Sequence, residues 1–323
     1  MGQFAQLGNS ADTHNFAPSG QRLATHAGSC KQFDLWPFEH FSFTTRILMI
    51  ENNNQFFALT GQTISAIRDV LTKAAEAASR ETLAHFRSNL SVDNKLAVGF
   101  DPVTVADKQA ERAIRAVISA SFPDHVIIGE EEATKETGSD FSWIIDPIDG
   151  TRSFISGVPL WGTLIGFAYK GRVLAGLMNQ PFIGETFLAI PGSALWHRNG
   201  DTKTLEVSGV KSLATSRLFT TAPELFDTPQ RQAIWNAISS ASQVRRFGCD
   251  CYAYCLLAAG HADIVIEPAL NIYDIAALVP IVEQAGGYLT TWEGGSADQG
   301  GDIIAAASKE LLDETLALIA AQR

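Results

Sequence analysis

The sequence lacks the features that mark membrane, nucleic-acid-binding and secreted proteins. No run in its 323 residues approaches the roughly 18 consecutive apolar residues of a membrane-spanning helix. Basic residues are few: 24 Lys and Arg stand against 35 Asp and Glu, and the net charge of −11 disfavours nucleic acid, whose phosphates select basic surfaces. No continuous apolar stretch near the start resembles a secretory signal. We therefore expect a cytoplasmic, globular protein that binds neither membranes nor nucleic acid.

Cysteine is also rare, with four residues in the chain. Cys249, Cys251 and Cys255 cluster, but their spacings lack the second ligand pair of a zinc site. Free thiols in a reducing compartment are therefore favoured over a metal or redox site. A P-loop lysine motif and a Gly-x-Ser-x-Gly elbow are both absent, which leaves NTPase and serine-hydrolase functions without support. No metal-ligand spacing connects four of the histidines, namely His85, His125, His197 and His261.

The segment Trp143–Thr151 carries the clearest chemical signal. A short apolar run brings Asp146 and Asp149 onto a turn, where Pro147 fixes φ between them and Thr151 begins a predicted helix. A helix N-terminus offers free N–H groups and a positive dipole end to a phosphate. Two carboxylates suit Mg²⁺, which binds one or two carboxylates together with phosphate oxygens. The segment therefore predicts metal-assisted phosphate chemistry.

Four motifs of the chain resemble, in the same order, the signatures of the inositol monophosphatase family. They are the D-x-V-T-x-x-D element at Asp101–Asp107, the glutamate segment Ile128–Glu131, the first signature at Asp146–Thr151, and the second signature at Tyr273–Ala277 and Glu283–Gly287. The resemblance covers roughly residues 55 to 320. It is closer to the histidinol-phosphatase branch in segments 151–163, 178–181, 248–254 and 267–274, and Tyr273 stands where the family usually has tryptophan.

The resemblance implies a Mg²⁺-dependent phosphomonoesterase with roughly two or three metal ions per site. The implied metal ligands are Glu130, Asp146, Asp149, Asp274 and the carbonyl of Ile148. The implied catalytic residues are Asp107, Thr151 and Glu130. Asp107 and Thr151 would hydrogen-bond to each other beside the attacking water, and the backbone N–H groups of Gly150 and Thr151 would bind the phosphate. The structural alternatives are an N-cap for Asp274 and relief of the helix macrodipole by Asp107.

Substrate contacts are expected from the second half of the chain. Asp250 and Glu267 lie at positions that resemble the family's substrate-contacting residues, Arg245 is a third expected contact, and Asn179 and Tyr252 are further pocket candidates. An aspartate at position 250 suits a cationic substrate such as L-histidinol phosphate, which carries an ammonium group and a titratable imidazole. Its alternative role is a helix N-cap. The sequence therefore favours hydrolysis of histidinol phosphate by metal-activated water, in histidine biosynthesis.

Other functions stay open at this point. The substrate could instead be inositol phosphate, a sugar bisphosphate or a 3′-phosphonucleotide. A catalytically inactive, metal-binding regulatory protein is the alternative of another class. The resemblance, and nothing else in the sequence, implies a homodimer.

The expected fold is α+β and α/β, and the resemblance implies a layered αβαβα sandwich with two subdomains. We expect a disordered extension at residues 1–48, an α+β metal- and phosphate-binding subdomain at 49–205, and an α/β subdomain at 206–323 that contributes Asp274 and the substrate contacts. Helices are expected at 60–90, after Thr104, and at 229–240, 252–259, 274–285 with a kink at Pro280, and 308–321. Strands are expected at 126–128, 143–145, 164–168, 173–177, 186–190, 218–221, 244–247, 264–266 and 303–306, with a hairpin turn at Gly171-Arg172.

Overall fold

The computed structural model describes residues 47–52, 55–88, 92–94 and 102–323. The extension expected at residues 1–48 lies outside them, apart from positions 47 and 48, which belong to strand β1 (Ile47–Asn52) and pair with β2 (Gln55–Thr60). Asp101, the first residue of the D-x-V-T-x-x-D element, also lies outside them. Within the described residues, no helix combines the length and the apolar character that crossing a bilayer requires.

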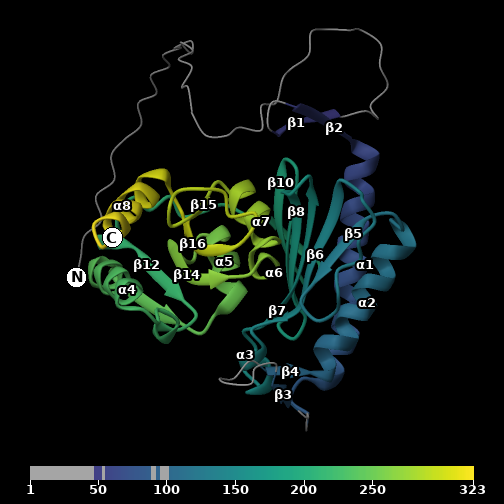
Figure 1. Ribbon diagram of the computed structural model, residues 1–323, viewed down its shortest axis with the longest axis horizontal. Coiled ribbons are helices and arrows are strands. Elements are labelled where there is room, and N and C mark those ends of the chain that lie inside the picture. The colour runs from purple at the N-terminus through teal and green to yellow at the C-terminus, as the bar shows by residue number, and fades with distance from the viewer. Residues whose placement is uncertain (1–46, 53–54, 89–91, 95–101) are drawn as a thin grey trace, which may run out of the picture.

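Two long helices cover one face of the first sheet (Figure 1). Helix α1 (Gly61–His85) buries a stripe at helical spacing that includes Leu71 and Ala78, and α2 (Val105–Ser121) packs beside it through Ile114. Both helices were predicted, and α1 ends at His85 rather than near residue 90. The short pair β3 (Val92–Asn94) and β4 (Pro102–Thr104) leads into α2.

The first sheet has seven strands, in the order β11-β10-β9-β8-β7-β6-β5. Their bounds are β5 (Val126–Gly129), β6 (Phe141–Asp149), β7 (Gly162–Tyr169), β8 (Arg172–Gln180), β9 (Glu185–Ile190), β10 (Ser193–Arg198) and β11 (Asp201–Thr204). Strands β5 and β6 are parallel and the other neighbours are antiparallel, which confirms the predicted meander. The prediction missed both β10 and β11. The four residues of β11 are polar and exposed and so show no apolar alternation.

The hairpin between β7 and β8 turns one residue earlier than predicted. Tyr169 pairs with Arg172, so the two turn residues are Lys170 and Gly171 rather than Gly171 and Arg172. Both have positive φ, 47° and 78°, as a type I′ turn requires. Glycine tolerates this conformation without steric cost, and the twist of a primed turn matches that of the flanking strands.

The second sheet has five strands, in the order β13-β12-β14-β16-β15. Their bounds are β12 (Arg217–Thr220), β13 (Val244–Phe247), β14 (Ile264–Leu270), β15 (Tyr288–Thr291) and β16 (Gly301–Ala306). Helices α4 (Pro229–Ala241) and α8 (Lys309–Ala320) cover its outer face, and Ser308 caps α8 as predicted. Two short 3₁₀ turns, Leu213–Thr215 and Pro223–Leu225, flank β12.

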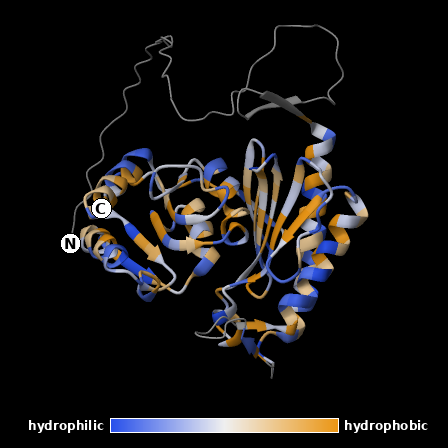
Figure 2. Cartoon of the chain, viewed as in Figure 1, coloured by the Kyte–Doolittle hydropathy of each residue, from blue (hydrophilic) through white to orange (hydrophobic). Residues whose placement is uncertain are grey.

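A middle layer of helices lies between the two sheets (Figure 1). It consists of α5 (Asp250–Ala258), α6 (Ile272–Ile275) and α7 (Leu278–Gln284). Its core joins side chains of the first sheet, such as Leu164, to side chains of the second, such as Val265. Figure 2 shows hydrophobic residues on the strands of both sheets and on the helices between them. The order of layers confirms the predicted αβαβα sandwich.

The predicted helix at 274–285 is in fact two helices. Helix α6 ends at Ile275, and Ala276 and Ala277 form a turn before α7 begins. Pro280 has no N–H to donate to the carbonyl of Ala276, which explains a break at this place. The turn lies tightly against the first sheet, because a Cβ added to Gly176 would stand 2.0 Å from the carbonyl oxygen of Ala277. This close approach seats α6 beside β6.

Candidate metal centre

Three carboxylates from distant parts of the chain meet beside β6. Asp146 and Asp149 come from the end of that strand and Asp274 from α6, and one oxygen of each lies within 4.8 Å of the others. The pairing of β6 with β7 shifts register between Asp146 and Asp149, and Asp146 Oδ1 accepts a hydrogen bond of 3.0 Å from the N–H of Ile148. This bulge turns both acids toward the same place.

Burial and mutual repulsion act on these acids in the same direction. Burial raises the pKa of Asp146 well above its usual value, and the charges of Glu130, Asp149 and Asp274 raise it further. Burial likewise raises the pKa of Asp149, together with the charges of Asp250 and Asp274. A divalent cation would relieve both effects, and an all-oxygen donor set suits Mg²⁺. The residues present therefore fit the predicted metal.

Glu130 lies next to this group, although it is not one of the three acids that share the 4.8 Å distance. Strand β5 runs parallel to β6 and pairs Gly129 with Ile145, so Glu130 follows level with Asp146. The side chain of Glu130 lies close enough to Asp146 and Asp107 for its charge to raise the pKa of both. The predicted ligands Glu130, Asp146, Asp149 and Asp274 are thus brought together from three elements.

Asp107 occupies the third position of α2 and closes a capping box. Its Oδ2 accepts hydrogen bonds from the N–H of Thr104 at 2.8 Å and from its hydroxyl at 2.6 Å. Its Oδ1 is buried and has no hydrogen-bond partner among the described residues, and burial raises the pKa of Asp107 to about 6. Asp107 therefore has a structural role in the capping box, beyond the predicted relief of the macrodipole, and this role leaves one carboxylate oxygen available.

The predicted hydrogen bond between Asp107 and Thr151 is not present. The hydroxyl of Thr151 donates instead to the carbonyl oxygen of Ile148 at 3.0 Å. Thr151 begins α3 (Thr151–Ile155), so its hydroxyl reaches the carbonyl three residues back in the same turn, while Asp107 Oδ2 is committed to the capping box. The predicted helix start at Thr151 is confirmed.

Gly150 connects β6 to α3 in a left-handed conformation, with φ of 83°. A Cβ at this position would stand 3.1 Å from Asp250 Oδ2 and 3.2 Å from the carbonyl oxygen of Leu160. Both the conformation and the close approach therefore favour glycine here. The turn brings the predicted phosphate segment directly against a carboxylate of the middle helix layer.

Asp274 and Asp250 both differ from their predicted capping roles. Asp274 is the third residue of α6 rather than its N-cap, and its Oδ2 accepts a hydrogen bond of 2.7 Å from the N–H of Asn271. Asp250 is the first residue of α5, the N-cap is Cys249, and Asp250 Oδ2 accepts a hydrogen bond of 3.2 Å from Ser153. The side chain of Asp250 thus faces α3 instead of capping its own helix.

Glu267 lies close to Asp250, whose charge contributes to raising its pKa. It is 2% exposed and accepts hydrogen bonds from the N–H of Thr221 at 2.5 Å and from the hydroxyl of Thr220 at 3.1 Å. Burial is the largest cause of a pKa near 8. The structure therefore brings two of the three predicted substrate residues together.

The third predicted substrate residue, Arg245, is directed elsewhere. It lies on β13, an edge strand whose four residues are exposed, and its guanidinium donates to the carbonyl oxygen of Ser239 in α4. Asn179 is also a structural residue, since its side chain bonds the hydroxyls of Ser79 and Thr186.

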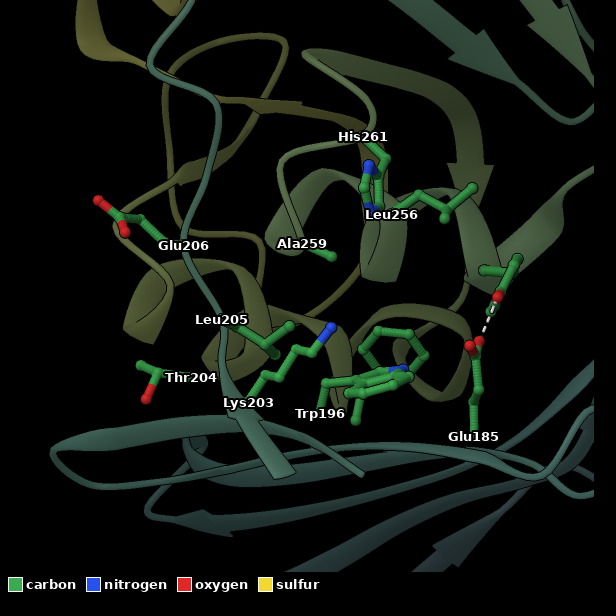
Figure 3. A pocket seen from close by; sticks show the side chains of 11 residues that line it. Glu185, Trp196, Lys203, Thr204, Leu205, Glu206, Leu256, Ala259 and His261 are labelled. Atoms are coloured by element: carbon green, nitrogen blue, oxygen red, sulfur yellow. Dashed lines mark hydrogen bonds between the residues drawn. The ribbon is translucent and has the colours of Figure 1, made fainter. Parts of the chain in front are cut away.

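Tyr252 lines a cavity of about 410 Å³ between α5 and the strands β9 and β10, where its hydroxyl donates to Glu185 (Figure 3). Trp196 and Lys203 form another wall, and none of the three clustered acids lines the cavity. Cys249, Cys251 and Cys255 form no disulfide among the described residues.

Two features of the site were not predicted. The N–H of Cys251 donates to Asp149 Oδ2 at 2.7 Å, which ties the middle helix layer to the metal centre. Glu111 is fully buried in α2, one turn after Asp107. A charged residue at helical spacing within an apolar stripe was the signal that could have identified it.

The chain has clear relatives among known proteins. The model of the inositol monophosphatase family matches residues 64–323. The bifunctional phosphatase IMPL2, chloroplastic, of Arabidopsis thaliana is 40% identical over 222 residues, which cover 68% of this chain and 62% of that protein, less than two thirds of its length. A histidinol-phosphatase of Chlorobaculum parvum is 38% identical over 247 residues, which cover 76% of this chain and 93% of that protein.

A solved structure agrees with these relatives. An inositol monophosphatase from Zymomonas mobilis superimposes with a TM-score of 0.70 at 33% identity, covering 79% of this chain and 98% of that one. The family match, the layered fold and the acidic cluster point in the same direction. The chain therefore belongs to the inositol monophosphatase family, whose members are Mg²⁺-dependent phosphatases of small phosphorylated substrates.

Proposed function

We propose that this chain hydrolyses L-histidinol phosphate to L-histidinol and inorganic phosphate, in histidine biosynthesis. The observation that supports this substrate is the position of Asp250, whose carboxylate lies against the Gly150 turn. A phosphate bound by that turn would have this carboxylate beside it. Like charges repel at such distances, so the arrangement favours a substrate that carries a positive charge close to its phosphate.

A second acid strengthens the case for a cationic substrate. Burial raises the pKa of both Asp250 and Glu267, so both carboxylates would gain from a positive partner. The ammonium group of histidinol phosphate would supply that partner, whereas the hydroxyl groups of an inositol ring would not. Among the relatives, the name histidinol-phosphatase belongs to the Chlorobaculum protein.

The metal would be held by Asp146, Asp149 and Asp274, with Glu130 beside Asp146 and the Ile148 carbonyl as a further donor. When bound there, Mg²⁺ supplies the charge that polarises the phosphate and lowers the pKa of a bound water. The N–H groups of Gly150 and Thr151 would bind the phosphate oxygens.

Asp107 and Thr151 would orient and deprotonate the attacking water. Asp107 Oδ1 is buried and makes no hydrogen bond within the part of the chain that the structure describes, so it can accept the proton that the water loses. The hydroxyl of Thr151 donates to the Ile148 carbonyl, and its oxygen can still accept a hydrogen bond from the water. The two residues would then act on one water without contacting each other.

The test compares kcat/KM for L-histidinol phosphate and myo-inositol 1-phosphate, with Mg²⁺, in the wild type and in Asp250→Asn. Asparagine tolerates the positive φ of 43° at this position and keeps an acceptor for Ser153, so the substitution removes little except charge. We expect a preference for histidinol phosphate, and a rise in its KM of about tenfold in the variant, equivalent to about 1.4 kcal/mol. KM for inositol phosphate should stay nearly constant.

Ser153→Ala is the matched control, because it removes the hydrogen bond to Asp250 and leaves the charge in place. It should affect the two substrates alike. A wild-type preference for inositol phosphate, or equal losses on both substrates in Asp250→Asn, would refute the substrate assignment and leave the metal site standing. If neither substrate releases phosphate in the presence of Mg²⁺, an inactive metal-binding protein would be favoured.

A further inference from the structure

Helix α2 holds a buried charge to which none of the roles above assigns a function. Glu111 is 0% exposed, and its Oε1 accepts a hydrogen bond of 2.8 Å from Nε of Arg115, which lies one turn further along the same helix. Burying a carboxylate is costly even when it is paired, so the surroundings of this ion pair should show what it stabilises.

The ion pair binds the backbone that follows β5. Glu111 Oε2 accepts a hydrogen bond of 2.8 Å from the N–H of Glu131, and Oε1 accepts one of 3.0 Å from the N–H of Glu132. Arg115 Nη2 donates to the carbonyl oxygen of Glu132 at 3.0 Å. This segment is neither helix nor strand, so side chains of α2 provide the hydrogen bonds that a regular element would otherwise provide.

Gly129 lets the ion pair come this close. A Cβ at Gly129 would stand 2.1 Å from Glu111 Oε1 and 2.7 Å from Arg115 Nη2. Contacts below about 3 Å are sterically forbidden for carbon and oxygen. A side chain at this position would therefore force the ion pair of Glu111 and Arg115 away from the backbone. The backbone is thus held on both sides of Glu130: Gly129 before it lies against the ion pair, and the N–H groups of Glu131 and Glu132 after it bind Glu111.

We propose that Glu111 is a positioning residue for the metal centre. By fixing the backbone of residues 129–132, it directs the carboxylate of Glu130 toward Asp146, which stands level with Glu130 on the neighbouring strand. Glu111 itself touches backbone and Arg115 and acts only through Glu130. The inference rests on the metal site of the proposed function and is independent of which phosphate ester is the substrate. Loss of the Glu111 carboxylate should weaken metal binding more than it slows the chemical step.

The test is the affinity for Mg²⁺ of Glu111→Gln, measured by calorimetry on the full chain without substrate. Glutamine keeps the shape and one acceptor but places an NH₂ group against an N–H donor, so one of the two backbone hydrogen bonds is lost. We expect affinity to fall about tenfold or more, as for other residues that hold a ligand in place. Turnover at saturating Mg²⁺ should recover most of the wild-type rate.

Two control variants separate positioning from stability. Arg112→Ala removes the ion pair of 2.7 Å with Glu132 at a largely exposed position and should leave Mg²⁺ affinity unchanged. Asp263→Asn removes a fully buried carboxylate of the second sheet's layer and should lower the melting temperature without changing Mg²⁺ affinity. If Glu111→Gln behaves like Asp263→Asn, Glu111 is a structural residue only and the inference is wrong.

A measurement on the wild type covers the case in which Glu111→Gln does not fold. The amide protons of Glu131 and Glu132 should be protected from hydrogen exchange although their segment has no regular structure. Exchange at the rate of an open loop would overturn the inference.

Because Mg²⁺ affinity and amide exchange need no substrate, a protein that binds Mg²⁺ normally but does not hydrolyse histidinol phosphate would refute the proposed function and leave this inference intact.

Discussion

The buried carboxylates of this molecule fall into two contrasting groups. Burial alone would raise the pKa of Asp263, but hydrogen bonds from Arg217 and Ser208 outweigh it and hold the pKa below its usual value. At the buried Asp146 and the half-buried Asp149, burial and the charges of neighbouring acids both raise the pKa. The chain supplies a positive partner for Asp263, whereas it brings like charges together at Asp146 and Asp149.

The difference separates structural acids from functional ones. A carboxylate that only stabilises the fold is paired within the chain, as Asp263 is with Arg217 and Asp298 with Arg172. Acids that repel one another cost stability in the folded chain, and groups with such perturbed pKa values concentrate at functional sites. A bound cation converts the second arrangement into the first, which is why the cluster beside β6 fits a metal centre.

The largest effect should come from removing one acid of the cluster. Asp149→Asn should lower turnover by about a thousandfold or more, equivalent to about 4 kcal/mol of transition-state stabilisation, because the charge is needed for metal binding. The fold should survive, since an asparagine oxygen can still accept the hydrogen bond from the N–H of Cys251. Steady-state kinetics and a melting curve without Mg²⁺ test this. Near-normal turnover would place the metal site elsewhere.

The opposite result is expected for the paired acid. Asp263→Asn should lower the free energy of unfolding by about 2–4 kcal/mol, because it leaves the guanidinium of Arg217 without its charged partner. Turnover at saturating Mg²⁺ should stay close to that of the wild type. Denaturant unfolding measures the first quantity. A stability loss of equal size in Asp149→Asn would erase the distinction between the two groups.

A smaller effect should appear in the pH dependence of the same pair. The folded-state pKa of Asp263 is lowered, so its contribution to stability is present above the unfolded value of about 4 and is lost as pH falls through the folded value. The difference in unfolding free energy between the wild type and Asp263→Asn should therefore be constant near neutral pH and shrink below about pH 4. A difference that grows on acidification would mean that the pKa is raised instead.

Much of the fold followed from the sequence because its signals are local. The helical stripe of α1, the capping serine of α8 and the apolar strands β6 to β9 were predicted from spacing alone. What failed depends on tertiary contacts. Pro280 predicted a kink, but the kink is a full break where Ala277 approaches Gly176, and β11 is a polar strand that forms because β10 offers it an edge.

The site shows the same division. Asp146 and Asp149 stand on one turn, so their proximity could be predicted, and Asp274 and Glu130 followed from the family resemblance. The direction of Arg245 toward Ser239 could not be predicted, because nothing in the sequence tells which way a residue on an exposed edge strand points. The place of Glu111 in the apolar stripe of α2 indicated burial, but its partners are backbone N–H groups about twenty residues away, and these carry no sequence signature.

The most direct test of the central claim is a calorimetric titration of Mg²⁺ into the purified chain and into Asp149→Asn, at mildly acidic pH and in buffers of different ionisation enthalpy. The wild type should bind Mg²⁺ and release protons, because carboxyl groups with raised pKa values must ionise to become ligands. The variant should lose most of this binding. Equal binding by the two proteins, or binding without proton release, would contradict a metal centre built from the acids beside β6.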